Sequence, residues 1–200
     1  MKTTPKIAEY LISRDKKMKS VIGENIIIDR PLESDYFASL VDTIISQQLS
    51  GKVAEVLTKR LAEACQGKFT PQTILKLEDE KIRSLGISYA KIKYLKSLAT
   101  ALESKVVDFS LITDLNDQEI IDMLTKIKGI GPWSAEMFLI FSLGKEDVFS
   151  CGDGGLVKAV NHYYGKGEDL SKETLLKISE KWRPYRSYAS FYLWESLKRI

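Results

Sequence analysis

Cysteine, histidine and long apolar runs are scarce in this sequence, and each scarcity excludes a class of protein. The 200 residues include two cysteines and one histidine. Two cysteines cannot supply a four-thiolate cluster, and Cys65 and Cys151, far apart in sequence, do not suggest a disulfide framework. We therefore expect a reducing, intracellular setting. No apolar run is long enough to span a membrane, and the N-terminal segment lacks the apolar core of a secretory signal, so we expect neither.

The balance of charge, by contrast, excludes few classes of protein by itself. Lysine and arginine number 30 against 27 aspartates and glutamates, a formal net charge of +3. This mildly basic balance allows a nucleic-acid partner without requiring one. The 44% hydrophobic content is enough for one sizeable domain or two small helical lobes. Because the chain has no internal repeat, low-complexity stretch or flexible linker, we expect a single domain over residues 1–200.

Apolar residues recur at helical spacing along most of the chain. The stretches Phe37–Ile45, Val53–Leu61 and Ile92–Leu102 show this spacing clearly. Near the end of the chain we also expect helices over Leu175–Trp182 and Tyr188–Ile200. Asn116–Glu119 has the pattern of a capping box, which marks the start of a helix. Ile26–Ile28 is a brief β-like run, and we predict an extended connector because one strand cannot make a sheet. The sequence therefore predicts an all-α fold of two helical lobes with a cleft.

The most specific motif is the hairpin sequence Ile127-Lys128-Gly129-Ile130-Gly131-Pro132, flanked by amphipathic stretches. Two glycines two residues apart let the backbone turn sharply and approach a partner closely, and Ile130 between them can pack into the core. Pro132 begins a helix whose free N–H groups and dipole favour an anion such as a DNA phosphate. A plain turn between helices would have the same pattern, so these residues alone leave both interpretations open.

A loop rich in glycine and acid follows at about residues 147–155. Asp153 lies where a helix should begin, so the helix dipole would help to keep its carboxylate ionised. An N-cap residue would occupy the same place, and that role alone would also explain the aspartate. Asp147 is a second candidate carboxylate in the loop.

The hairpin and the acid loop, in this order, resemble the helix-hairpin-helix superfamily of DNA glycosylases over roughly residues 30–200. The resemblance implies a hairpin region at about 117–143 and gives Asp153 the position of the catalytic aspartate; Ser150 replaces the family's usual proline. Cleavage of an N-glycosidic bond develops positive charge on the deoxyribose. A fixed carboxylate stabilises that charge and orients the attacking water.

The resemblance also implies how DNA and an ion are held. In that family, hairpin amides bind a DNA phosphate and hairpin carbonyls hold a monovalent cation that bridges to it. We expect no required cofactor, and no iron–sulfur cluster because four cysteines would be needed. The implied DNA contacts are Lys128, Gly129, Ile130 and Gly131, and the implied ligands of Na⁺ or K⁺ are the carbonyls of Thr125, Ile127 and Gly129.

Two further positions narrow the implied chemistry. Members that also cleave the strand carry a nucleophilic lysine two residues after the second hairpin glycine, and that position is Trp133 here. An indole forms no Schiff base, so we expect base removal by water alone. The segment Asp42–Ser50 resembles the alkylated-base branch, which includes 3-methyladenine DNA glycosylase II and compact forms without its N-terminal β domain. Two interpretations are then open for Gln47, Gln48 and Leu49. They fill the gap left by a flipped nucleotide, or they form only a polar helix end.

The region Trp182–Ala189 and Trp194 also resemble the alkylated-base branch. By this resemblance Trp133, Met137 and Trp194 line the base pocket, where aromatic rings suit a cationic alkylated purine. A structural place in the core would equally explain Trp194. Met137 replaces a tyrosine found in some relatives, and His162 has no role in this scheme.

We therefore expect a monofunctional DNA glycosylase that removes alkylated purines of the 3-methyladenine type in base-excision repair. Its partner would be double-stranded DNA with damaged bases. We expect a monomer that lies inside the cell, where the DNA is, and that does not associate with a membrane. One alternative is a glycosylase with lyase activity on oxidised bases. The other is a non-enzymatic helix-hairpin-helix module that only binds DNA.

Overall fold

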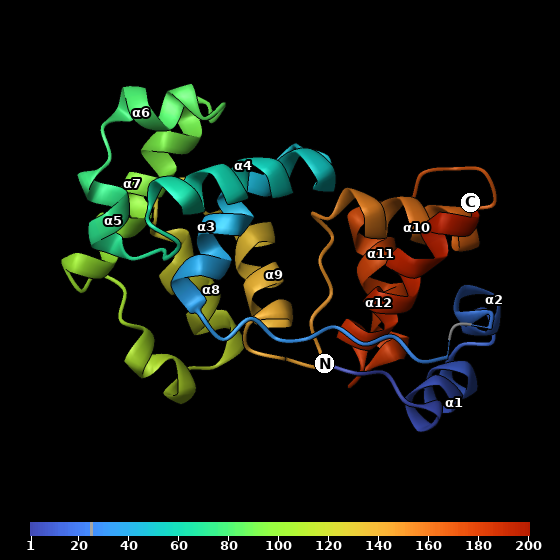
Figure 1. Ribbon diagram of the computed structural model, residues 1–200. Helices are drawn as coiled ribbons and strands as arrows, with labels where there is room; N and C mark the ends of the chain where they lie inside the picture. Colours follow the sequence, from blue (N-terminus) through green and yellow to red (C-terminus); the bar gives the residue numbers. More distant parts are fainter. Residues whose placement is uncertain (25) are drawn as a thin grey trace. The chain divides into compact units, whose positions relative to one another are not determined.

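The structure is a computed structural model that describes residues 1–24 and 26–200, and it is helical (Figure 1). Within these ranges no strand forms, and one isolated antiparallel bridge joins Lys2 to Asp29. Ile26–Ile28 leads into this bridge and forms neither helix nor strand, in keeping with the predicted connector. The prediction of an all-α fold is therefore confirmed. In the same ranges no helix is both long enough and apolar enough to cross a bilayer.

The helices gather into two compact units. Unit 1 is built from both ends of the chain, Met1–Leu32 and Leu139–Ile200. Unit 2 is the middle of the chain, Glu33–Phe138. The boundary between Phe138 and Leu139 falls inside one helix, α9.

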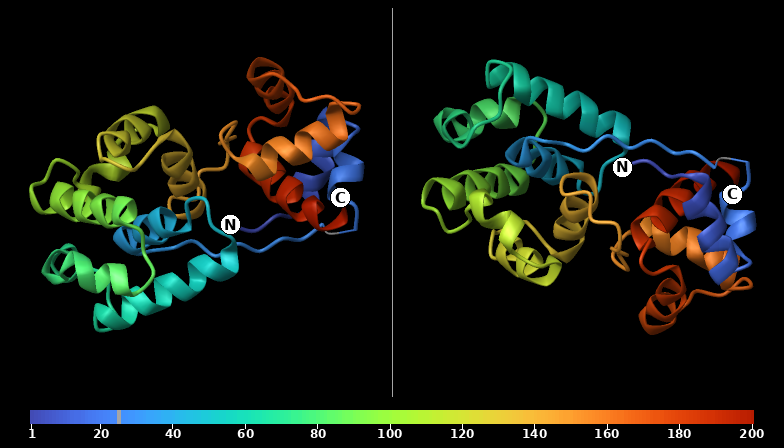
Figure 2. Two further views of the ribbon diagram at one scale, coloured as in Figure 1. Left: turned by 90° about the horizontal axis from the view of Figure 1, so that it is seen from above. Right: turned by 90° about the horizontal axis from the view of Figure 1, so that it is seen from below.

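Unit 2 is organised around its longest helix, α7, which contacts α3, α5 and α6 (Figure 2). A short 3₁₀ helix, Phe109–Asp114, follows α7. The buried faces of α3 and α7 carry the leucines and isoleucines whose helical spacing the sequence showed. The α-helices of unit 2 are α3 (Tyr36–Ser46), α4 (Gly51–Ala64), α5 (Pro71–Lys76), α6 (Asp79–Ser84), α7 (Tyr89–Glu103), α8 (Asp117–Thr125) and the first part of α9 (Pro132–Phe141).

The predicted capping box starts α8. The Asn116 side chain accepts hydrogen bonds from the backbone N–H groups of Gln118 and Glu119, each at 3.0 Å. Glu119 returns the bond by accepting from the Asn116 N–H at 2.7 Å. These bonds satisfy N–H groups that the first turn of a helix leaves without partners, which fixes where α8 begins.

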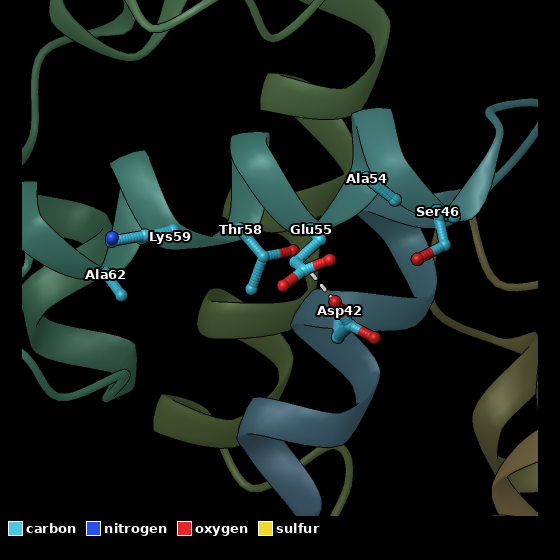
Figure 3. Close-up of a pocket in the computed structure, with 8 residues that line it drawn as sticks. Asp42, Ser46, Ala54, Glu55, Thr58, Lys59 and Ala62 are labelled. Carbon is cyan, nitrogen blue, oxygen red and sulfur yellow. Dashed lines mark hydrogen bonds between the residues drawn. The ribbon is translucent and has the colours of Figure 1, made fainter.

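A shallow acidic groove lies along the pair formed by α3 and α4 (Figure 3). Asp42 on α3 accepts a hydrogen bond from the Thr58 hydroxyl on α4 at 2.8 Å, and Glu55 lies on the same side. The groove contains none of the residues predicted to bind DNA or a base. Its hydrogen bond links the two helices that the turn Gln47–Ser50 joins.

Unit 1 is organised around α12, which contacts α2 and α10 (Figures 1 and 2). Trp182 is fully buried in its core, with Phe149 and Tyr164 at ring-centroid distances of 5.5 and 6.1 Å. The α-helices of unit 1 are α1 (Pro5–Arg14), α2 (Met18–Ile22), the end of α9, α10 (Gly154–Tyr164), α11 (Lys172–Ser179) and α12 (Arg186–Ser196).

Two helix boundaries in unit 1 differ from the sequence prediction. The helix expected over Leu175–Trp182 is α11, which ends at Ser179 and continues as a 3₁₀ turn over Glu180–Trp182. The helix expected from Tyr188 begins two residues earlier, at Arg186, and ends at Ser196 before a second 3₁₀ turn. Apolar spacing marks only the buried face of a helix, so polar residues at its ends are assigned poorly.

Candidate functional site

The acid loop ends at Asp153, which is the N-cap of α10. The backbone N–H of Leu156 donates to its Oδ1 at 2.8 Å. The indole Nε1–H of Trp194 donates to the same oxygen at 2.9 Å. Asp153 is half-buried, so its carboxylate is held from two sides and retains some exposure. The cap that the residues alone suggested is real, and the indole bond adds an orienting contact that a cap does not need.

Trp194 belongs to a group of three aromatic residues in unit 1. Its ring centroid lies 5.6 Å from that of Phe141 and 6.1 Å from that of Phe191, with tilted planes. Phe191 is fully buried, whereas Phe141 and Trp194 are half-buried. Phe141 was not predicted from the sequence, because an aromatic residue at the end of the apolar helix α9 is equally expected in the core. These rings give the surroundings of the Asp153 carboxylate an apolar, aromatic character.

Gly155 makes the close approach of the carboxylate and the indole possible. A Cβ atom at this position would lie 3.1 Å from Oδ1 of Asp153 and 3.3 Å from Cδ1 of Trp194. Both distances are shorter than ordinary van der Waals contacts. At the neighbouring Gly154 a Cβ atom would have nothing within 4 Å. Of these two adjacent glycines, only Gly155 is therefore required by packing around the carboxylate.

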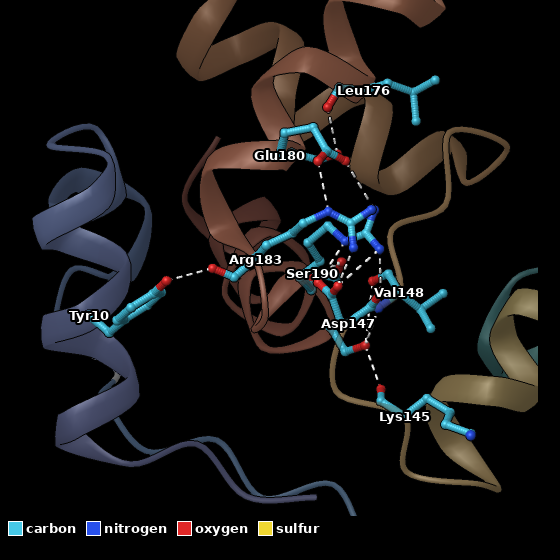
Figure 4. Close-up of polar contacts among 11 residues, drawn as sticks. Tyr10, Lys145, Asp147, Val148, Leu176, Glu180, Arg183 and Ser190 are labelled. Atoms are coloured by element: carbon cyan, nitrogen blue, oxygen red, sulfur yellow. Dashed lines mark hydrogen bonds and ion pairs between the residues drawn. The ribbon is translucent and has the colours of Figure 1, made fainter. Parts of the chain in front are cut away.

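The other carboxylate of the acid loop, Asp147, is part of an ion-pair cluster (Figure 4). Arg186 donates from Nε to Oδ1 of Asp147 at 2.7 Å and from Nη2 to its backbone carbonyl at 2.6 Å. Arg183 donates to Oδ2 at 2.5 Å and pairs also with Glu180, whose pKa it lowers. Both oxygens of Asp147 are thus engaged by guanidinium groups. Asp147 anchors the loop, which leaves Asp153 as the better candidate for chemistry.

Ser187 adds a second anchor for the start of the loop. Its hydroxyl donates to the Lys145 carbonyl at 2.6 Å and accepts from the Val148 N–H at 3.0 Å. Figure 4 shows Lys145 and Val148 converging on this region from the chain that follows α9. The N-terminal end of α12 therefore fixes the segment that leads to Asp153, and sequence spacing alone gave no sign of this pairing.

In unit 2, the hairpin between α8 and α9 turns at Gly129, which has φ of +96°. A Cβ atom there would lie 2.1 Å from Cγ of Tyr94 on α7, so the hairpin packs directly on that ring. Ile130 is buried with 4% exposure, as the sequence analysis expected, while Lys128 is exposed. At Gly131 a Cβ atom would have nothing within 4 Å. The first glycine is needed for the fold, whereas the second keeps the backbone open.

The turn after α3 is tied to this hairpin. The Gln47 side-chain amide donates to the Gly129 carbonyl at 2.9 Å and to the Ser134 hydroxyl at 3.2 Å. The structure thus brings one predicted residue of the turn onto the hairpin. Gln48 follows with φ of +58°, and both Gln48 and Leu49 are exposed. The tip of the turn is therefore Gln48–Leu49, and Gln47 is its fixed base.

The remaining predicted residues lie in unit 2. Trp133 and Met137 are four residues apart on α9, hence on one face of the helix; Trp133 is half-buried and Met137 has 7% exposure. Of the predicted cation ligands, the Ile127 carbonyl accepts the Ile130 N–H at 3.0 Å and the Gly129 carbonyl accepts Gln47. Each carbonyl has a second lone pair, and neutral oxygens suit a hard monovalent cation. In the described ranges no group of three or more histidine, cysteine or acidic side chains could hold a metal.

The chain is similar in sequence and in fold to known DNA glycosylases. A DNA-3-methyladenine glycosylase of Saccharomyces cerevisiae is 33% identical over 230 residues, which cover 93% of this chain and 77% of that protein. A solved structure of a Schizosaccharomyces pombe 3-methyladenine DNA glycosylase in complex with abasic DNA is 33% identical with a TM-score of 0.88. The match covers 96% of this chain and 97% of that one. A Bacillus subtilis relative is also 33% identical, but the chain spans only 62% of its length.

The family model that matches the chain is that of the HhH-GPD superfamily base excision DNA repair proteins, over residues 41–184. This range includes the turn after α3, the hairpin, the acid loop and Arg183, which pairs with Asp147 of that loop. The resemblance inferred from the two motifs is thus confirmed at the level of the family. The chain belongs to the HhH-GPD superfamily of base excision DNA repair proteins.

Proposed function

We propose that this protein is a monofunctional DNA glycosylase that hydrolyses the N-glycosidic bond of alkylated purines, of the 3-methyladenine type, in base-excision repair. The observation that carries the proposal is the Asp153 carboxylate, which Trp194 and the first turn of α10 hold at the edge of an aromatic group. The names of the relatives support the substrate class. We further propose that the two units work as one glycosylase domain.

Asp153 supplies the one charge that the reaction needs. As the bond from base to C1′ breaks, positive charge develops on the deoxyribose, and a fixed carboxylate stabilises it. The same carboxylate orients or deprotonates the attacking water, which adds to C1′ and leaves an abasic site. An alkylated purine is already cationic, so it departs as a neutral base without a strong general acid. Trp133 stands where a Schiff-base lysine would, so the mechanism has no strand-cleavage step.

The hairpin holds the DNA backbone in this proposal. Gly131 leaves its surroundings open, so a phosphate can approach the N–H groups at the start of α9, where the helix dipole favours an anion. Lys128 contributes an exposed positive charge, and Gly129 and Ile130 shape the turn. If Na⁺ or K⁺ binds, the carbonyls of Thr125, Ile127 and Gly129 hold it, and it adds a positive charge for the phosphate.

The turn after α3 fills the gap that a flipped base leaves. We assign this role to Gln48 and Leu49, because both are exposed and the Gln47 amide is engaged by the hairpin. Leu49 has 38% exposure, and an exposed leucine at a turn tip suits insertion between bases. Gln47 then acts in DNA binding through the hairpin rather than by insertion.

The base pocket is proposed to use Trp133, Met137 and Trp194, joined by Phe141. The indole of Trp194 and the ring of Phe141 lie 5.6 Å apart by centroid, so they form a continuous aromatic surface near Asp153. Cations are attracted to aromatic faces, which favours an alkylated purine over the neutral normal base. Such a pocket selects by charge and stacking rather than by reading each base edge.

The test is incubation with methylated duplex DNA and identification of the released bases by chromatography. We expect 3-methyladenine or 7-methylguanine to be released, with no crosslink to DNA on borohydride reduction. A borohydride crosslink would instead indicate a glycosylase with lyase activity on oxidised bases. If the protein binds DNA and releases no base, the non-enzymatic binding module becomes the better account. We also propose that the protein acts as a monomer inside the cell, where the DNA is. Sedimentation of the protein with the duplex measures how many protein molecules bind each duplex.

A further inference from the structure

Lys91 on α7 lies beneath the turn that follows α3. Its ammonium group donates to the carbonyls of Ile45 and Gln47, at 2.6 and 2.8 Å. Lys91 is half-buried, and burial lowers its pKa. The last carbonyls of a helix have no partner within the helix and carry partial negative charge, so a cation at this end is favourable. Lys91 therefore caps α3 from another helix.

The tip of the turn combines an unfavourable backbone conformation with a hollow at its side. Gln48 adopts a left-handed φ of +58°, which is unfavourable for a residue other than glycine, asparagine or aspartate. The Leu49 N–H donates to the Ser46 carbonyl at 3.1 Å, which closes the turn. Next to the turn is a hollow of about 340 Å³ bordered by Leu49, Gly86 and Lys91. Beside this hollow, the polar bonds at the base of the turn are the contacts best placed to hold the tip.

Two such bonds anchor the base from different elements. The Gln47 side chain is bound to the hairpin through Gly129, and the Gln47 carbonyl is bound to Lys91 on α7. A group that has to replace a flipped nucleotide must hold its position against the stacked bases on either side. Accordingly, we propose that Lys91 is a positioning residue for DNA recognition, one that holds the Gln48–Leu49 tip ready for insertion. This inference rests on the proposed function.

The same helix offers a matched control. Lys96 donates to the carbonyls of Leu75 and Leu77 at 3.1 and 2.5 Å and so caps the end of α5 in the same manner. Lys91→Met and Lys96→Met therefore each remove a lysine cap that α7 provides, and Lys96→Met also removes an ion pair with Asp79 at 3.7 Å. Only the first belongs to the turn, so an effect of general destabilisation would appear in both variants.

The experiment measures affinity for two duplexes, one undamaged and one with a tetrahydrofuran abasic-site analogue, which already has the gap. The dissociation constant for the undamaged duplex, divided by that for the duplex with the abasic-site analogue, reports how well the tip fills the gap. We expect Lys91→Met to reduce this ratio roughly tenfold and Lys96→Met to leave it within about twofold of wild type. Hydrogen exchange of the Leu49 amide should accelerate in Lys91→Met alone.

An unchanged ratio in Lys91→Met, or an equal loss in Lys96→Met, would overturn the inference. So would a wild-type protein that does not prefer the abasic-site analogue. None of these readouts depends on base release. Failure of the proposed function would show separately, as absence of any released base from methylated DNA by a wild-type protein that still prefers the gap.

Discussion

The substitution Gly155→Ala tests directly whether the carboxylate and the indole are held in a set geometry. The added methyl group would lie 3.1 Å from Oδ1 of Asp153 and 3.3 Å from Cδ1 of Trp194. It would also lie 3.3 Å from Cδ1 of Leu197, so these neighbours must give way by a few tenths of an ångström. The hydrogen bond between them, now 2.9 Å, is the contact most exposed to that movement.

The size of the effect follows from a comparison with Gly154→Ala. Both glycines lie in the first turn of α10, where alanine gains up to about 1 kcal/mol in helix propensity. Only the methyl at position 155 meets neighbours, and overpacking of this kind costs about 1–3 kcal/mol. We therefore expect Gly155→Ala to be less stable than Gly154→Ala by about that amount. Because a misplacement of 1 Å can cost about a hundredfold in rate, a smaller shift should cost on the order of tenfold.

The assay is single-turnover release of 3-methyladenine from a defined duplex, with urea unfolding of the same samples. Single-turnover conditions exclude product release, so the rate reports the reaction and the flipping of the base. A wild-type rate in Gly155→Ala would contradict the proposed role of this geometry. An equal loss of rate in Gly154→Ala would show that the effect belongs to the loop backbone and not to the contact with the carboxylate.

Three other predictions concern the hairpin, the loop anchor and alkaline pH. Gly129→Ala should unfold unit 2 in a circular dichroism melt because its Cβ would overlap Tyr94, whereas Gly131→Ala should keep the melting temperature and weaken duplex binding in fluorescence anisotropy. Arg186→Met should cost about 1.5–3 kcal/mol in urea unfolding and slow base release, because it removes charged hydrogen bonds to the loop. Burial raises the pKa of Tyr164 above its ordinary 10.0, so the unfolded chain alone loses this proton and stability should fall above about pH 10, less steeply in Tyr164→Phe. Three results would contradict these predictions: a wild-type melting temperature in Gly129→Ala, a wild-type unfolding free energy in Arg186→Met, and a wild-type stability that does not fall above about pH 10.

The parts of the fold that sequence predicted well are those set by local chemistry. The Asn116 capping box, the proline start of α9 and the glycine turn at Gly129 are each determined by a few neighbouring residues. Apolar spacing likewise marked α3 and α7, because their buried faces repeat with the helical period. These features needed no knowledge of which elements pack together.

The parts that sequence could not give are contacts between residues far apart in the chain. The bond from Trp194 to Asp153 spans 41 positions, and the bond from Gln47 to the Gly129 carbonyl spans 82. Nothing in either local sequence specifies the partner. Asp147 shows the consequence: from sequence it competed with Asp153, and only the fold brought Arg186 to it. A carboxylate's role depends on what folding places beside it.

The measurement that tests the central claim most directly compares Asp153→Asn with wild type in single-turnover release of 3-methyladenine. Asparagine keeps an oxygen to accept from Trp194 and from the Leu156 N–H, so the cap survives and only the charge is lost. We predict at least a roughly hundredfold loss of rate, with stability and duplex affinity close to wild type, because electrostatic stabilisation is the largest contribution of such a group. Base release by Asp153→Asn at the wild-type rate would contradict the account.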